Sequence, residues 1–157
     1  MQRQDYKDEF VAQAGLRKII IPDVDNKHWQ KLFNFLKKTE TDLRFFIDDV
    51  EQVLPSSLEA VFEDNQHYYL LSLILDGVVL NCDFERIDTI VFRFDPGLIT
   101  DVTKATLLFR VMSTFARRLG KVALMSEENK ETSPIFRYEH GKGLIYLKLN
   151  KKFELYE

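Results

Sequence analysis

The sequence contains little of what usually stabilises or exports a secreted protein. Its single cysteine, Cys82, has no partner within the chain, so a disulfide framework is excluded. Six glycines and four prolines in 157 residues are too few for a collagen-like or low-complexity chain. The first ten residues, MQRQDYKDEF, have no apolar segment of the kind found in a secretory signal. We therefore expect a protein of the reducing cytoplasm.

The sequence also lacks a membrane-spanning run and the familiar catalytic motifs. Its longest apolar stretch, residues 68–80, is interrupted by Ser72, Asp76 and Gly77. This stretch falls short of the roughly 18–20 residues that span a bilayer. HExxH, CxxC, GxSxG and the glycine-rich dinucleotide and P-loop patterns are all missing. We expect no membrane association, no cofactor and no enzymatic activity.

The residues that most often bind metals or act as nucleophiles are isolated from one another. His28, His67 and His140 are far apart in the sequence and have no second ligand at a metal-binding spacing, so no metal site is expected. Cys82 precedes Asp83, and a neighbouring carboxylate raises the pKa of a thiol. We expect Cys82 to be a small buried side chain rather than a nucleophile.

The chain has ample material for a hydrophobic core. Hydrophobic residues make up 45% of it and include thirteen Phe and six Tyr, a content that excludes intrinsic disorder. Its length fits one domain, for which the typical size is roughly 100–200 residues. We expect a single domain over residues 1–157, with residues 1–16 forming a loose or short helical lead-in.

The first half of the chain reads as one helix among several strands. Residues 17–21 and 43–47 predict strands, and between them a helix capped by Asp23 or Asp25 places Trp29, Leu32, Phe33 and Leu36 on one buried face. The segments 68–75 and 78–84 predict a hairpin, because the intervening Asp-Gly is the preferred type I′ turn. Residues 89–94 predict a further strand, whereas residues 58–62 fit either a helical turn or a strand.

The second half repeats this pattern around a longer helix. Thr100, Asp101 or Thr103 can cap a helix that runs to Leu119 and ends at Gly120. Residues 122–125 predict a short strand, 134–138 and 144–149 a second hairpin, and 151–157 an edge strand. Hairpins dominate, so we predict an α+β fold: a mostly antiparallel sheet of about six to eight strands with two main helices packed on one face.

Charge is distributed unevenly along the chain. Residues 1–38 carry a net charge of +3, residues 39–101 of −11 and residues 102–157 of +5, which gives −3 in total. A surface patch of one sign accelerates association with an oppositely charged partner, although a merely solvated acidic face also fits this composition. We predict that the middle segment binds a basic protein partner through a group of carboxylates: Asp48, Asp49, Glu51, Glu63 and Asp64.

Cations on the second predicted helix offer a competing interpretation. Arg110, Arg117, Arg118 and Lys121, with Lys104 a few turns earlier, could form a stripe for nucleic acid. The chain as a whole is acidic, and no aromatic RNA-binding motif accompanies the stripe. The helix dipole favours cations near a helix C-terminus, so we expect no nucleic-acid partner.

The segment 115–143 is similar to small, stand-alone bacterial α+β proteins of the immunity type, which belong to contact-dependent or polymorphic toxin systems. This resemblance rests on Leu119-Gly120-Lys121, on Ser126-Glu127-Glu128-Asn129 and on Phe136-Arg137-Tyr138. It extends to the preceding Asp-Gly hairpin and to the strand Phe92-Arg93-Phe94-Asp95-Pro96, and together these parts cover about a third of the chain. It implies a cytoplasmic protein, monomeric or homodimeric, that binds one cognate basic toxin domain and blocks it.

Two other classes of protein remain open. A small enzyme or ligand-binding domain would place Arg137 and the loop 126–129 in a pocket, where the guanidinium orients an anionic ligand. A purely structural role would instead pair Arg137 with Glu127 or Glu128. A homodimeric module would associate through exposed sheet edges.

Overall fold

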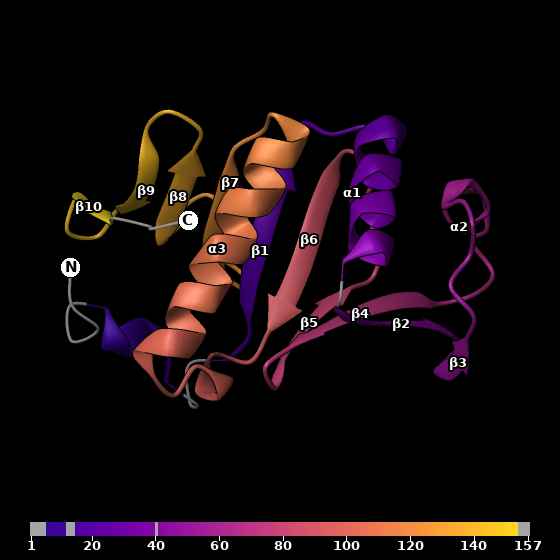
Figure 1. Cartoon of the computed structure of the whole chain (residues 1–157), viewed down its shortest axis with the longest axis horizontal. Helices are drawn as coiled ribbons and strands as arrows, with labels where there is room; N and C mark the ends of the chain where they lie inside the picture. The colour runs from indigo at the N-terminus through magenta and orange to yellow at the C-terminus, as the bar shows by residue number, and fades with distance from the viewer. Residues whose placement is uncertain (1–5, 12–14, 40, 154–157) are drawn as a thin grey trace.

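The computed structural model describes residues 6–11, 15–39 and 41–153, and within them ten strands form one antiparallel sheet (Figure 1). The strands lie in the order β10-β9-β8-β7-β1-β6-β5-β4-β2-β3. The elements are the 3₁₀ helices η2 (Lys7–Glu9) and η4 (Pro96–Leu98), the helices α1 (Asn26–Lys38), α2 (Glu59–Glu63) and α3 (Val102–Leu119), and the strands β1 (Arg17–Pro22), β2 (Asp42–Ile47), β3 (Val50–Gln52), β4 (Tyr69–Leu75), β5 (Val78–Cys82), β6 (Thr89–Phe94), β7 (Ala123–Glu127), β8 (Phe136–Glu139), β9 (Gly143–Tyr146) and β10 (Lys151–Phe153).

The predicted α+β class is confirmed. The two long helices, α1 and α3, lie side by side on the same face of the sheet (Figure 1). The sheet has more strands than the expected six to eight, and two of them, β3 and β10, contain only three residues each. Of these, β3 was not predicted, while β10 realises part of the expected edge strand. The remainder of that strand, residues 154–157, lies outside the described residues.

Local capping chemistry sets the helix boundaries. Asp25 caps α1, since its carboxylate accepts hydrogen bonds from the backbone N–H groups of Lys27 and His28. The His28 imidazole Nδ1 in turn accepts the Asp25 N–H at 3.1 Å, which completes a capping box. Asp101 caps α3, and Gly120 ends it at a φ of 64°. A left-handed φ of this kind favours glycine.

Two hairpins turn on pairs of residues with positive φ. Asp76-Gly77 has φ values of 48° and 79° and forms the predicted two-residue turn between β4 and β5. Asp48-Asp49, at 49° and 68°, forms an equivalent turn between β2 and β3. The sequence analysis missed this second hairpin because Asp-Asp contains no glycine and β3 is short. The undecided segment 58–62 became the helix α2.

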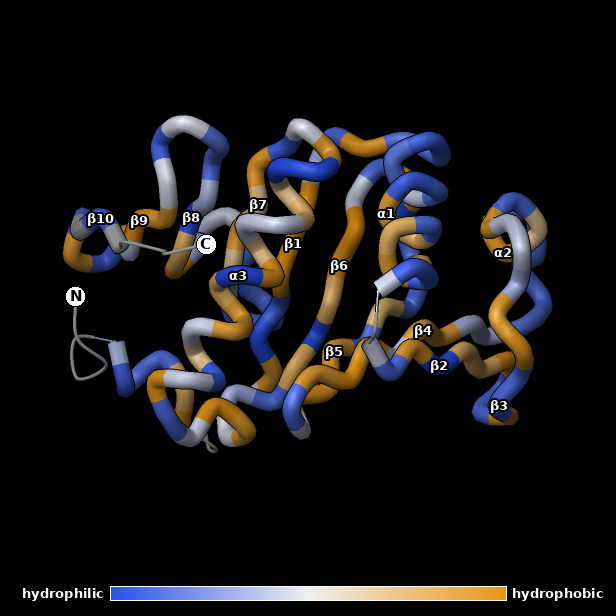
Figure 2. The backbone as a smooth tube through the Cα atoms, viewed as in Figure 1, coloured by the Kyte–Doolittle hydropathy of each residue, from blue (hydrophilic) through white to orange (hydrophobic). Residues whose placement is uncertain are grey.

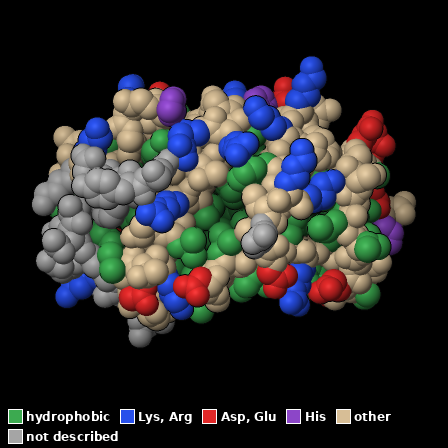
Figure 3. Space-filling model, in the orientation of Figure 1, with side chains coloured by type: hydrophobic (Ala, Val, Ile, Leu, Met, Phe, Trp, Pro, Cys, Tyr) green, Lys and Arg blue, Asp and Glu red, His purple; other side chains and the backbone are tan. Residues whose placement is uncertain are grey.

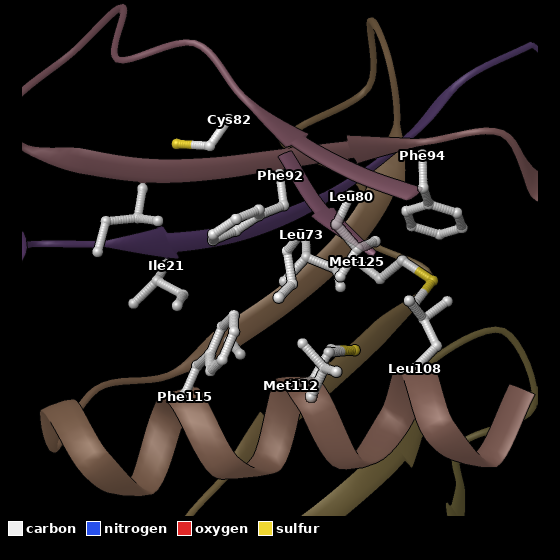
Figure 4. Close-up of a cluster of buried hydrophobic side chains, with 14 of the residues drawn as sticks. Ile21, Leu73, Leu80, Cys82, Phe92, Phe94, Leu108, Met112, Phe115 and Met125 are labelled. Carbon is white, nitrogen blue, oxygen red and sulfur yellow. The ribbon is translucent and has the colours of Figure 1, made fainter. Parts of the chain in front are cut away.

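One core joins the helix layer to the sheet. Side chains from α3, among them Met112 and Phe115, point at buried residues of β4, β5, β6 and β7 (Figure 4). Along β6 the side chains alternate, with Ile90, Phe92 and Phe94 buried and Val91 and Arg93 partly exposed on the other face. The tube in Figure 2 is accordingly hydrophobic along much of β1 and β6, beneath the helices.

The sheet bends strongly between β5 and β6. Only one residue pair, Asn81 opposite Arg93, is in register there. In Figure 1, β1 and β6 run upright, whereas β2, β4 and β5 lie across the view. This bend carries the β2–β3 hairpin and α2 to one end of the molecule, away from β8, β9 and β10.

The N-terminal segment contains a short helix, one of the two predicted alternatives, and residues 6–10 are packed rather than loose. Tyr6 and Phe10 are buried and make ring contacts with Phe109 and Phe136. The segment is therefore part of the core, a role that its polar sequence did not indicate. Among the described residues, no helix combines the length and apolarity needed to cross a membrane.

Candidate partner-binding site

The tip of the β2–β3 hairpin is fastened to the start of β4 by Asp48. Its backbone N–H donates to the Tyr68 carbonyl at 2.8 Å, and its carboxylate Oδ1 accepts the Tyr68 N–H at 2.8 Å. The second carboxylate oxygen, Oδ2, lies 2.6 Å from Nδ1 of His67. Because one side chain makes two of these bonds, the hairpin tip has a defined position although it is exposed.

Neighbouring hydrogen bonds favour the ionised forms of two carboxylates at this end, Asp48 and Asp64. The backbone N–H of Tyr68, followed by the His67 side chain, lowers the pKa of Asp48. The hydroxyl of Tyr69, 2.6 Å away, and then the backbone N–H of Gln66 lower the pKa of Asp64. The hydrogen bond and the negative charge of Asp48 raise the pKa of His67. The ionised forms of Asp48 and Asp64 and the protonated form of His67 therefore stabilise one another.

All five predicted partner-binding carboxylates lie at this end of the molecule. The hairpin carries Asp48, Asp49 and Glu51, while Glu63 lies in α2 and Asp64 follows directly after it. The charges of Asp48 and Asp64 both act on His67, so the structure brings these two together. Glu51 lies 3.8 Å from Arg44, and Glu63 lines a groove between α1 and α2. We call residues 42–67 the acidic end.

The groove between α1 and α2 has a volume of about 460 Å³. Gln30 of α1 connects its walls, because its side-chain oxygen accepts the Leu58 N–H at 2.9 Å. The floor is apolar at Leu58 and Phe62, and Glu59 and Glu63 stand on the α2 side. A groove of this size lies within the about 300–1,000 Å³ of ordinary binding pockets. Lys27 of α1 also lines it, so the two carboxylates exceed the cations by one, and this excess favours a basic side chain on the α2 side.

Two exposed valines add apolar surface to the acidic end. Val50 is 60% exposed and Val53 is 91% exposed, the highest values among the exposed large hydrophobic side chains. Apolar side chains surrounded by charged ones are typical of binding surfaces, in which a small apolar centre supplies most of the affinity. The sequence analysis missed both valines because β3 was not predicted. A usable signal was present, since the β-branched Val53 lies two residues before Pro55 and the two serines of a predicted turn.

Outside the acidic end, two arginines of the middle segment pair with three of its carboxylates. Arg93, on the face of the sheet opposite the helices, pairs with Asp83 at 2.8 Å, Glu128 at 3.0 Å and Glu85 at 3.5 Å. Arg86 pairs with Asp88 at 3.0 Å. The net charge of −11 over residues 39–101 already counts these two arginines, and the acidic end carries −6 of it. Asp76, Asp95 and Asp101 are also exposed, but they lie outside the acidic end.

The alternative ligand site does not have the predicted arrangement. Arg137 lies opposite Leu124 and pairs with Glu139 at 3.3 Å instead of with Glu127 or Glu128, because Glu139 is two residues away on the same face of β8. Ser126 is fully buried within β7 rather than in a loop. That these residues hold a ligand stays a prediction.

The cysteine and two of the histidines that were considered for catalysis or metal binding are buried in the core or take part in hydrogen bonds of the fold. Cys82 is fully buried, as expected, and burial raises the pKa of its thiol to about 12. His28 completes the cap of α1, and His67 bonds Asp48. In the part of the chain that the structure describes, no group of three His, Cys, Asp or Glu side chains is arranged to hold a metal ion.

Comparison of the chain with models of protein families, with curated proteins and with solved structures finds no match. Function is therefore inferred from the acidic end itself.

Proposed function

We propose that this protein binds a basic partner protein through its acidic end, without catalysis, and that it acts as an immunity protein that neutralises a cognate bacterial toxin in the cytoplasm. The supporting observation is the concentration of charge. Residues 42–67 contain seven carboxylates and a single cation, Arg44, for a net charge of −6. These residues form one end of the molecule, with Val50 and Val53 exposed among the carboxylates.

This arrangement suits a toxin that acts on nucleic acid. Such a toxin carries a basic cleft that holds phosphates, and a protein surface with carboxylates can occupy the same cleft. The charges would accelerate association, while burial of Val50 and Val53 would slow dissociation. The groove between α1 and α2 would accept a basic side chain of the toxin, with its stem on Phe62 and its charge beside Glu59 and Glu63.

The proposal is tested with the triple variant Asp49→Asn, Glu51→Lys and Glu63→Lys, which leaves the structural bonds of Asp48 and Asp64 intact. The proposal expects a toxin domain to be encoded beside the gene for this chain, and that domain is the probe. Association is followed by surface plasmon resonance over a range of salt concentrations. We expect the association rate to fall by about tenfold or more at low salt and its salt dependence to flatten.

A matched control changes the net charge by the same amount elsewhere. The variant Asp8→Lys, Asp76→Asn and Glu139→Lys includes Asp76, an aspartate of positive φ in the other two-residue turn. Its association rate should fall much less. Equal losses in both triple variants would show a general charge effect and contradict the proposed site. Growth of cells expressing the toxin tests neutralisation: the wild type should protect them, and the first triple variant should protect them less.

A further inference from the structure

The two long helices form a surface of opposite charge to the acidic end. Together α1 and α3 contain eight Lys or Arg residues and no Asp or Glu. Figure 3 shows basic side chains around the part of this face that the helices cover. The helix dipole favours cations only near a helix C-terminus. Four of these cations lie elsewhere in their helices, so the dipole does not account for this composition: Lys27, Lys31, Lys104 and Arg110. We call this surface the basic helix face.

An apolar groove lies between the two helices on the basic helix face. Phe35 of α1 forms part of one wall, Leu107 and Val111 of α3 form the other, and Leu73 and Leu75 of β4 lie below them. At one end the Arg118 guanidinium covers the Phe35 ring, 4.2 Å from its centroid. The groove is visible as a hydrophobic hollow near the centre of Figure 3.

The size and the lining of this groove indicate apolar side chains of a protein as its occupant. Its volume is about 190 Å³, less than the about 300 Å³ of the smallest typical ligand pockets. A phosphate backbone would gain little from walls made of Phe35, Leu107 and Val111. A protein segment with one or two exposed apolar side chains among carboxylates would satisfy both the groove and the surrounding cations.

The chain itself contains such a segment. Val50 and Val53 are strongly exposed at the β2–β3 hairpin, and Asp48, Asp49 and Glu51 surround them. The acidic end carries a net charge of −6, and the two helices together carry +8. We infer that the β2–β3 hairpin of a second copy of this chain docks into the groove between α1 and α3, with its valines in the groove and its carboxylates beside the helix cations.

Such a contact joins two different surfaces, so a pair of copies that makes it once retains one unused hairpin and one unused groove. Interfaces of this type close into rings or extend into chains rather than stopping at a symmetric dimer. The contact is small and rich in exposed charge, so it should be weak and sensitive to salt. This inference does not require the proposed toxin, but a partner that occupies the acidic end would compete with self-association.

Sedimentation velocity of the full chain over a concentration series tests the inference without any partner. We expect the average mass to rise with concentration at low salt and to return to that of a monomer at high salt. Val53→Lys should weaken association by about tenfold or more, because it places a cation at the groove of the second copy. Leu149→Lys, a change of the same kind at another exposed residue, should leave association unchanged.

A mixing experiment separates this contact from other kinds of association. Leu107→Glu blocks the groove, and Arg118→Glu reverses one charge of the basic helix face without altering the groove floor; thermal unfolding of each shows that it is folded. Neither Val53→Lys nor a folded groove variant should associate alone. Their mixture should form a one-to-one complex and no larger species. In that complex the groove variant supplies the one intact hairpin and Val53→Lys supplies the one intact groove.

Two results would overturn the inference. One is that the wild-type chain stays monomeric at every concentration in low salt. This result would overturn the inference even if the basic helix face were found to bind a different molecule such as DNA. The other is self-association that Val53→Lys and Arg118→Glu leave unchanged, since that would place the contact at the sheet edges. Neither result bears on toxin binding, which is measured separately.

Discussion

His67 lies between two carboxylates at the acidic end and couples the stability of the hairpin to pH. Asp48 raises the pKa of His67, so the stabilisation from this histidine is complete below its ordinary value of 6.5 and is lost as pH rises through the raised folded value. The Tyr68 N–H lowers the pKa of Asp48, so its contribution is present above 3.8 and is lost as pH falls through the lowered value. The pair is therefore most stabilising in mildly acidic solution.

The first prediction concerns this pair. Replacing Asp48 by Asn, which also tolerates positive φ, removes the charge and should shift the pKa of His67 down toward 6.5. The measurement is an NMR titration of the His67 imidazole. Asp42→Asn is the control, because Asp42 pairs with Arg44 instead, and it should leave the titration where it was. An unchanged midpoint in Asp48→Asn would disprove the coupling.

At the scale of elements, an ionic cluster fixes the segment after β7 to the middle of the sheet. Arg93 of β6 bonds Glu128, and Lys18 of β1 bonds Glu131 at 2.6 Å. Both cations lie on the face opposite the helices, where Lys18 is buried and Arg93 is 19% exposed. The cluster thus holds a polar segment against a part of the sheet that no helix covers.

The second prediction is that Arg93→Met destabilises the fold by about 2–3 kcal/mol. Breaking a fully buried pair costs roughly 3–5 kcal/mol, and the partial exposure of Arg93 reduces this cost. Urea unfolding measures the change. Arg86→Met removes a cation whose ion pair with Asp88 is exposed, so its effect should stay within about 0.5 kcal/mol. Similar losses in the two variants would mean that the cluster around Arg93 contributes no special stability.

At the scale of the whole molecule, the core joins segments that are distant in the sequence. Phe136 of β8 contacts Tyr6 and Phe10 at one end of the chain and Phe109 of α3 in its middle. The core also spans the bend between β5 and β6, where strand pairing contributes one register pair. Side-chain packing, more than the strand ladder, therefore connects the two parts of the sheet.

The third prediction follows from the position of Phe10. Phe10→Ala should destabilise the fold by about 3 kcal/mol, because it removes a buried ring from this core. Thermal or urea unfolding, followed by both circular dichroism and fluorescence, should show one transition at a lower midpoint. Val11→Ala, a neighbouring residue that is 40% exposed, should change stability by no more than about 0.5 kcal/mol. A midpoint in Phe10→Ala equal to that of the wild type would show that the N-terminal segment is not part of the core.

Several parts of the fold could be predicted because they depend on neighbours in the sequence. The caps at Asp25 and Asp101, the stop at Gly120 and the Asp76-Gly77 turn each satisfy backbone groups within a few residues. The sequence predicted the excess of negative charge only as a sum over the sixty-three residues 39–101, without the three-dimensional positions of the carboxylates. The structure shows that Asp83 is largely buried against Arg93, whereas Asp48 and Glu51 face solvent.

Composition and periodicity by themselves determined the α+β class, the two long helices, most of the strands and the excess of negative charge in the middle of the chain. These properties follow from local backbone preferences and from the need to bury apolar faces. Only the tertiary structure decided which charges meet, since pairing between distant residues depends on the strand order and on the bend at β5–β6. That arrangement placed an acidic hairpin with exposed valines at one end of the molecule and an apolar groove among cations between its helices.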